Sequence, residues 1–93
     1  MAKRALAVRS GTPAYVKTLS AALRSRLKGA QVMYERVRGN RFRFEVVWGK
    51  FDSMGHPERQ RLVWDLVDDV LDKPDLLNVA MIITLGKDDL PSD

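Results

Sequence analysis

The chain has 93 residues, of which 45% are apolar and 30% are charged, and it contains no cysteine. A chain of this length forms one small domain with a single core. Without cysteine it has no disulfide framework, thiolate zinc site, cysteine nucleophile or iron–sulfur cluster held by its own thiolates. A small domain without disulfides fits the cytoplasm, and no apolar run approaches the roughly 20 residues of a membrane span.

The charges are unevenly distributed along the chain. Residues 1–50 contain 12 Lys and Arg against two acidic residues, a net charge of +10, whereas residues 51–93 contain 4 against 10, a net charge of −6. A basic half indicates a polyanion or an acidic protein surface as partner. The alternative is that the two halves mainly solvate and attract each other.

We expect residues 1–11 to be a flexible N-terminal tail, residues 12–90 a single domain and residues 91–93 a C-terminal tail. The first predicted helix covers residues 12–29, with Thr12 as its cap, Pro13 at its first position and Gly29 at its end. Its apolar residues recur at helical spacing and predict one buried face: Val16, Leu19, Ala22, Leu23 and Leu27.

Two predicted strands follow, over residues 30–37 and 41–48, joined by a turn at Gly39 and Asn40. A two-residue loop places Arg38 opposite Arg41 and Arg36 opposite Arg43. Alternation then predicts a core face of Met33, Val37, Phe42, Phe44, Val46 and Trp48, on which Glu35 is a misfit. The other face is predicted to carry Val32, Tyr34, Arg36, Arg38, Arg41, Arg43, Glu45 and Val47.

The second predicted helix covers residues 57–72. Its buried stripe is predicted to be Leu62, Val63, Leu66, Val67, Val70 and Leu71. Four aspartates on one side are interpreted as a solvated face rather than a cation site: Asp65, Asp68, Asp69 and Asp72. The segment Lys73-Pro74-Asp75 breaks the helix, and residues 78–85 predict a buried strand rather than a further helix.

The order α-β-β-α-β predicts an α+β fold, a two-layer sandwich in which a three-stranded mixed sheet carries its helices on one face. The helix between the second and third strands predicts a parallel crossover.

The only histidine, His56, lies just before the second predicted helix. No nucleophile is held beside it by the sequence pattern, and no second histidine accompanies it as a metal ligand. We therefore interpret His56 as a cap or surface residue, and we expect no catalytic residue, no metal site, no cofactor and no enzymatic activity.

Arginine supplies phosphate contacts and stacks on bases, and tyrosine adds a stacking surface. The hairpin therefore predicts a nucleic-acid-binding face, with a second patch at the start of the following helix, where free N–H groups favour phosphate. The alternative is a charged face that only keeps the edge soluble. The candidate residues are Tyr34, Arg36, Arg38, Arg41, Arg43 and Lys50 on the hairpin side, and Arg59 and Arg61 at the helix start.

Residues 14–90 resemble the BolA family. The resemblance lies in the element order, in the segment from Phe51 to "ERQRLVWDLV" and in the closing strand "NVAMIITL", with anchors at Phe51, Arg59, Arg61, Val63, Ala80 and Met81. It implies a fold like a type II KH domain and a small, non-enzymatic, cytoplasmic regulator linked to transcription and stress response. It also implies DNA or RNA, or a monothiol glutaredoxin sharing an iron–sulfur cluster, as partners.

Three positions differ from the pattern that the resemblance implies. Gln60 stands where the family has the histidine of Arg-His-Arg. The family's cluster ligands would fall at Asn78 or Val79, and in the turn Arg38-Gly39-Asn40, where no residue binds iron in the family's manner. The leading prediction is therefore a nucleic-acid-binding regulator. The alternative is a protein-interaction module that docks a monothiol-glutaredoxin-like partner without sharing a cluster.

Overall fold

The computed structural model describes residues 11–91. Its elements are α2 (Ala14–Arg26), β1 (Gln31–Arg38), β2 (Arg41–Val47), α3 (His56–Val70), α4 (Lys73–Leu76) and β3 (Val79–Leu85). Two short 3-10 turns, η1 (Gly49–Ser53) and η2 (Lys87–Asp89), follow β2 and β3. Most of the predicted N-terminal tail and the last two residues lie outside the described range, so the predicted tails stay predictions.

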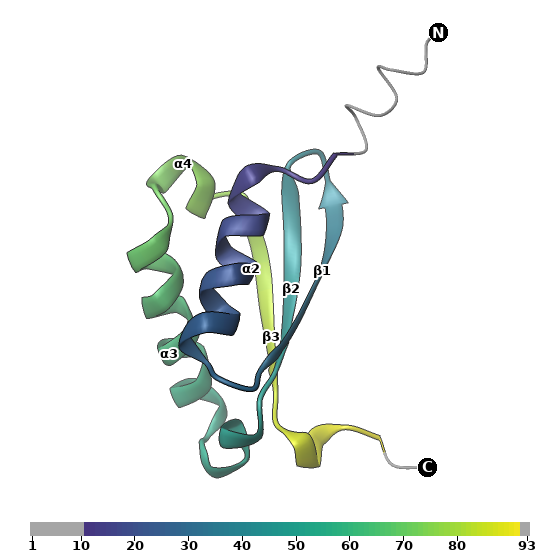
Figure 1. Cartoon of the computed structure of the whole chain (residues 1–93), viewed down its shortest axis with the longest axis vertical. Helices are drawn as coiled ribbons and strands as arrows, with labels where there is room; N and C mark the ends of the chain where they lie inside the picture. Colours follow the sequence, from purple (N-terminus) through teal and green to yellow (C-terminus); the bar gives the residue numbers. More distant parts are fainter. Residues whose placement is uncertain (1–10, 92–93) are drawn as a thin grey trace, which may run out of the picture.

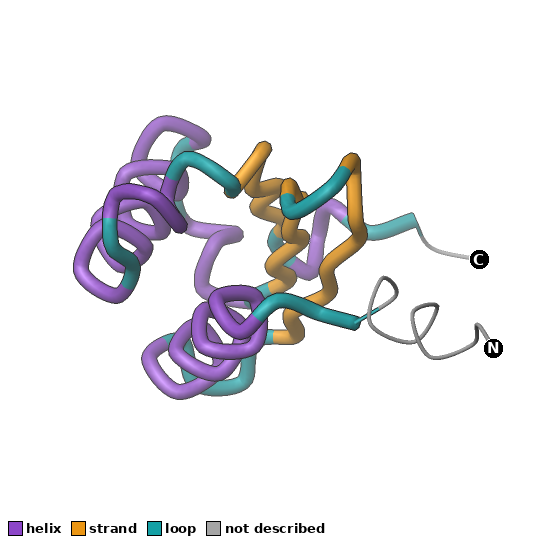
Figure 2. The backbone as a smooth tube through the Cα atoms, turned by 90° about the horizontal axis from the view of Figure 1, so that it is seen from above, coloured by secondary structure: helices purple, strands orange, loops and turns teal. Residues whose placement is uncertain are grey.

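The strands form one mixed sheet in the order β1-β2-β3. β1 and β2 are antiparallel, and β3 runs parallel to β2 after the crossover through α3 and α4. Helices α2 and α3 lie on one face of this sheet (Figures 1 and 2). The predicted α+β two-layer sandwich is therefore confirmed. Within residues 11–91, no helix has the length and hydropathy of a membrane-spanning segment.

The start of α2 differs from its prediction. Thr12 does not cap the helix; Pro13 occupies the N-cap position, and its carbonyl accepts the first helical bond from the Val16 N–H at 3.1 Å. Proline suits this position because it has no N–H to satisfy. The helix ends three residues before the predicted end, at Arg26, with Leu27 as its C-cap. Gly29 lies in the turn that follows, where its φ of +90° is a conformation that favours glycine.

The predicted helical stripes form the core. Val16, Leu19 and Leu23 of α2 have no exposed surface, and Val63 and Val67 of α3 are equally buried. They pack on the helix-facing side of β2, which contributes Phe42, Phe44 and Val46. Burying a side chain of this size contributes about 1.5–3 kcal/mol, so these stripes account for the layered fold.

Tyr15 joins three distant segments at the hairpin end of the sheet. Its buried hydroxyl donates to the carbonyl of Asn40 in the turn at 2.5 Å and lies 3.1 Å from the carbonyl of Asn78, which precedes β3. Burial raises the pKa of the Tyr15 hydroxyl, because the ionised form would lose its hydration. The neutral hydroxyl therefore ties α2 to the segments that lead into β2 and β3, at one end of the sheet.

The predicted register of the hairpin is wrong beyond the turn. Arg38 does face Arg41, and Gly39 has the positive φ of +55° that the turn requires. The register then shifts between Arg36 and Arg38, so Arg36 faces Phe42. One extra residue in a strand moves every later side chain to the opposite face.

The shift exchanges the two predicted faces of β1. Tyr34 aligns with Phe44 and therefore lies on the helix-facing side, as Arg36 and Val32 do, while Met33 and Glu35 lie on the open side. Met33 and Val37, predicted to be core residues, are 47% and 55% exposed. Glu35 is therefore not a misfit, because its charged side chain lies on the open side of the sheet and not in the core.

Candidate functional site

The basic end of the hairpin is built around Arg38 and Arg41. The turn at Gly39 and Asn40 places these two residues directly opposite each other, and both are exposed. Within residues 11–91, no carboxylate forms an ion pair with either of them. Like charges at opposed positions destabilise a strand pair. The pair is therefore a concentrated positive charge without a counter-ion in the described part of the chain.

Arg36 lies beside this pair but is held by the protein. Its guanidinium donates to the carbonyl of Gly39, and to the carbonyl of Gly11 at 2.6 Å. The same group lies 4.8 Å from the centre of the Phe42 ring, a cation–π distance. Arg36 therefore fixes the turn and the entry to α2 and also contributes positive charge at the surface.

The predicted single arginine face is split between the two sides of the sheet. Arg43 lies on the open side, where its guanidinium pairs with the Glu35 carboxylate at 2.9 Å. Tyr34 lies on the helix-facing side, with its ring centre 6.0 Å from that of Phe42 and 6.2 Å from that of Phe44. The prediction that Tyr34, Arg36 and Arg43 share a face is wrong, because the register shift moves β1 by one position relative to β2.

Lys50 is separated from the other hairpin candidates. It lies in η1, after the end of β2 that is remote from the turn, and its ammonium is 5.6 Å from the Trp48 ring centre. The structure therefore places Lys50 at the far end of the strand from Arg38 and Arg41.

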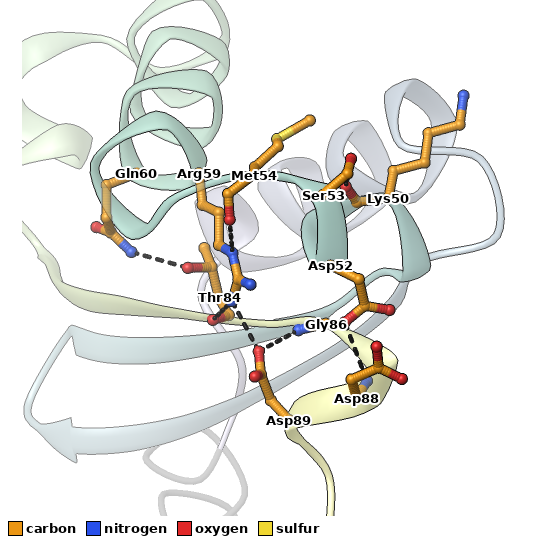
Figure 3. A network of polar contacts seen from close by, with 10 residues as sticks. All are labelled: Lys50, Asp52, Ser53, Met54, Arg59, Gln60, Thr84, Gly86, Asp88 and Asp89. Carbon is orange, nitrogen blue, oxygen red and sulfur yellow. Dashed lines mark hydrogen bonds and ion pairs between the residues drawn. The ribbon is translucent and has the colours of Figure 1, made fainter.

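Arg59 has a structural setting at the start of α3 (Figure 3). Its Nε donates to the Met54 carbonyl at 3.1 Å, and its Nη1 lies 2.7 Å from an oxygen of Asp89 and 3.4 Å from the Thr84 carbonyl. Its side chain is only 13% exposed. The donors of Arg59 are thus directed at the protein, which leaves little of the guanidinium for an outside phosphate.

Gln60 covers the edge strand β3 next to Arg59 (Figure 3). Its amide nitrogen donates to the Ile82 carbonyl at 3.0 Å and lies 3.3 Å from the Thr84 hydroxyl. Its amide oxygen accepts from the Trp64 indole at 3.1 Å. Sequence reasoning noted Gln60 only as a departure from the BolA pattern, and no local signal shows that it pairs with a strand more than twenty residues away.

Gly86, Asp52 and Asp89 complete this polar network. The Asp89 carboxylate accepts from the Gly86 N–H at 2.8 Å, and this bond, together with the Arg59 guanidinium, holds the pKa of Asp89 below its usual value. Asp52 accepts from the Asp88 N–H at 3.0 Å and occupies the space that a Cβ on Gly86 would need. The network therefore joins η1, the start of α3, β3 and η2.

Arg61 and His56 lie on the surface of α3. Arg61 is exposed, has no ion pair among the described residues, and borders a hollow of about 230 Å³ with Met54, Glu58, Leu62 and Asp65. His56 is exposed at the first position of α3, while the N-cap is Gly55. Of the two predicted roles for His56, the structure supports the surface one.

The residues do not fit the iron–sulfur cluster that the resemblance implies. The Asn78 amide donates to the Pro74 carbonyl, and Val79 is 6% exposed and has no donor atom in its side chain. The only histidine begins α3, at the opposite end of the molecule from the hairpin turn (Figure 1). Within residues 11–91, no group of three His, Asp or Glu side chains is placed to hold a metal ion.

Fold and site together define a small α+β protein with a basic hairpin end and a BolA-like fold. No protein-family profile and no curated protein sequence matches the chain. Among solved structures, BolA1 from Arabidopsis thaliana matches with a TM-score of 0.67 and 20% sequence identity, over 85% of this chain and 99% of that one. The predicted BolA-like fold is confirmed. At this identity the likeness concerns the fold.

Proposed function

We propose that this protein is a small, non-enzymatic regulator of BolA-like fold that binds nucleic acid through the end of its hairpin. The observation that carries the proposal is the opposed pair Arg38 and Arg41, which is exposed and has no carboxylate partner within residues 11–91. An anionic ligand relieves the repulsion between two such side chains. Phosphate groups supply that charge at regular spacing along a nucleic acid.

The surroundings of the pair support a polynucleotide rather than a single small anion. Arg36 adds a third positive charge, fixed in place by two carbonyls and the Phe42 ring. Tyr34 lies two residues from Arg36 on the same, helix-facing side of β1 and is 41% exposed. Proteins commonly bind single-stranded nucleic acids with a positively charged surface next to an aromatic ring. The arginines contact the phosphates, and a base stacks on the ring.

The candidate residues take different parts in this proposal. Arg38 and Arg41 contact phosphate directly, Arg36 positions the turn and adds charge, and Tyr34 stacks. Arg43 contributes less, since Glu35 already neutralises it. Arg59 acts by holding the fold. Lys50 and Arg61 lie on other parts of the surface and stay predicted secondary contacts.

The test is a fluorescence anisotropy titration with single- and double-stranded DNA and RNA oligonucleotides at several salt concentrations. The informative variant is Arg38→Gln with Arg41→Gln. A matched control is Lys17→Gln with Lys28→Gln, which removes the same charge from exposed positions of the α2 region. We expect the hairpin variant to weaken binding and to reduce the slope of log affinity against log salt by about 2, or about one per lost phosphate contact.

Two results would overturn the proposal. One is the absence of binding to all four oligonucleotides at low salt. The other is an equal loss of affinity in the hairpin variant and the α2 control, which would show attraction by net charge alone.

A second candidate function is a protein-interaction module that docks a monothiol-glutaredoxin-like partner without sharing a cluster. The BolA-like fold and the unsuitable side chains at Asn78 and Val79 favour it. It predicts co-elution with such a glutaredoxin in gel filtration. Mixing with the cluster-loaded partner should leave the visible absorption unchanged, and an altered spectrum would contradict the cluster-free form of docking. A role in transcription or stress response, in the cytoplasm, belongs to both candidate functions as an expectation.

A further inference from the structure

The two edges of the sheet are treated differently by the rest of the molecule. At the β3 edge, Gln60 and Arg59 of α3 reach the carbonyls of Ile82 and Thr84. At the other edge, no strand among residues 11–91 pairs with the outer side of β1. One edge is therefore covered by side chains, and the other presents backbone that no strand of residues 11–91 pairs with.

β1 is exposed along nearly its whole length. Seven of its eight positions are exposed, whereas β2 beside it buries four of seven. Three large apolar side chains of β1 are among the exposed ones: Met33, Tyr34 and Val37. An exposed edge strand with apolar side chains is a template for another strand, and proteins usually blunt such edges. This edge keeps a regular run from Gln31 to Arg36, because the register irregularity lies only beyond Arg36.

The charged residues near β1 indicate which charge a strand added at this edge should carry. Glu35 is matched by Arg43. Arg36, Arg38 and Arg41 have no ion pair within the described residues and lie at the turn end of the same hairpin. A strand that carries acidic side chains would be attracted to this edge, and a basic one would be repelled.

The open side of the hairpin offers a place for one side chain of an added strand. A shallow hollow of about 290 Å³ lies there, lined by Met33, Tyr34, Glu35, Arg43, Phe44 and Glu45. In strand addition, the main chain supplies affinity and such hollows select alternate side chains.

We propose that β1 accepts an extended acidic segment of a partner protein as a fourth strand, paired along residues 31–36. The incoming main chain bonds to the outer side of β1, its acidic side chains lie near Arg36 and Arg38, and an apolar side chain enters the hollow beside Met33. The two proposals share Arg36 and Arg38, but here the backbone of β1 makes the binding contacts. Neither proposal depends on the other.

The test uses the full chain and a fluorescent peptide of about eight residues in which glutamate and valine alternate, since strands are commonly about 5–6 residues long. One control peptide has lysine in place of glutamate. A second keeps the glutamates and carries N-methyl groups on all of its internal backbone nitrogens, which removes the N–H donors from both edges of the peptide. Anisotropy gives the affinities, and amide hydrogen exchange by NMR locates the contact.

We expect the glutamate peptide to bind and to slow exchange of β1 amides, and the lysine peptide not to bind. We expect the N-methylated peptide to bind at least about tenfold more weakly, because backbone hydrogen bonds carry the affinity. The variant Met33→Glu, at an exposed position, should reduce binding by charge repulsion while keeping the fold's circular dichroism spectrum.

Three results would overturn the proposal. Equal binding of the parent and N-methylated peptides would show a contact through charge alone. No change in the exchange of β1 amides would place the peptide elsewhere. Protection of β1 in the free protein together with a dimer in sedimentation would show that a second copy occupies the edge.

Discussion

Arg59 and the pair Arg38 and Arg41 are the same residue type in opposite settings. The Arg59 side chain is 13% exposed and surrounded by acceptors from Met54, Thr84 and Asp89. Arg38 and Arg41 are exposed and face each other at the end of the hairpin. The comparison shows that the supply of acceptors around a guanidinium, rather than its charge, separates a structural arginine from one available to a ligand.

The largest effect is expected when Arg59 is removed. Arg59→Ala should lower the free energy of unfolding by about 2–3 kcal/mol, because the carbonyls of Met54 and Thr84 lose a charged donor. The matched control is Arg61→Ala, two residues along the same helix and exposed, which should stay within about 0.5 kcal/mol of the wild type. Urea denaturation followed by tryptophan fluorescence measures both. Equal losses in the two variants would contradict the contrast.

The polar network around Arg59 also depends on space at Gly86. Gly86→Ala should cost about 1–3 kcal/mol, since the added Cβ would displace the Asp52 carboxylate and approach its backbone nitrogen. The same denaturation assay applies. Gly49→Ala is the control, because a Cβ there meets only Lys87 at an ordinary contact distance of 3.5 Å. A neutral Gly86→Ala variant would mean that η1 and η2 adjust freely.

Removing one arginine of the pair Arg38 and Arg41 should stabilise the protein rather than destabilise it. Arg38→Gln relieves the repulsion with Arg41 and should raise the free energy of unfolding by about 0.2–1 kcal/mol at low salt, while it weakens oligonucleotide binding. Added salt should reduce the gain in stability, because screening weakens the repulsion in the wild type. Denaturation at two salt concentrations checks the first effect and anisotropy the second. A loss of stability would show that Arg38 has a structural role like that of Arg59.

The smallest effect concerns acid stability. The Gly86 N–H and the Arg59 guanidinium lower the pKa of Asp89 below its usual value of 3.8. A carboxylate with a lowered pKa contributes stability above its unfolded pKa and loses it as the pH falls through the lower folded value. Asp89→Asn should therefore destabilise the protein at neutral pH, and the difference from the wild type should shrink below about pH 4.

Denaturation at neutral and acidic pH measures this difference. Asp68→Asn, on the exposed side of α3, is the control and should show a smaller change with pH. A difference between Asp89→Asn and the wild type that stays constant across the acidic range would contradict a role for the ionised Asp89.

The spacing of the apolar residues predicted most of the fold, because the face of each helix that is buried must be apolar. The stripes of Val16, Leu19 and Leu23 in α2 and of Val63 and Val67 in α3 are buried as expected. The short helix α4 was not predicted, since Pro74 was interpreted only as a breaker, although proline is tolerated in a first helical turn.

The hairpin register was not predictable from alternation alone. Alternation assumes an unbroken period of two, and the irregularity between Arg36 and Arg38 breaks it. The sequence did contain a warning, because Glu35 was a misfit on the predicted core face. The setting of Arg59 was beyond sequence reasoning for another reason, since its partner Asp89 lies thirty residues away along the chain.

The Tyr15 hydroxyl has a consequence for the order of folding. It contacts Asn40, 25 residues away, and Asn78, 63 residues away, so both contacts require the closure of long loops. A contact that is absent from the folding transition state changes the unfolding rate rather than the folding rate. We expect these long-range contacts of Tyr15 to form after that transition state. Tyr15→Phe should then speed unfolding and leave the refolding rate nearly unchanged in stopped-flow measurements. In that case Tyr15 sets the lifetime of the folded chain more than the speed of its formation.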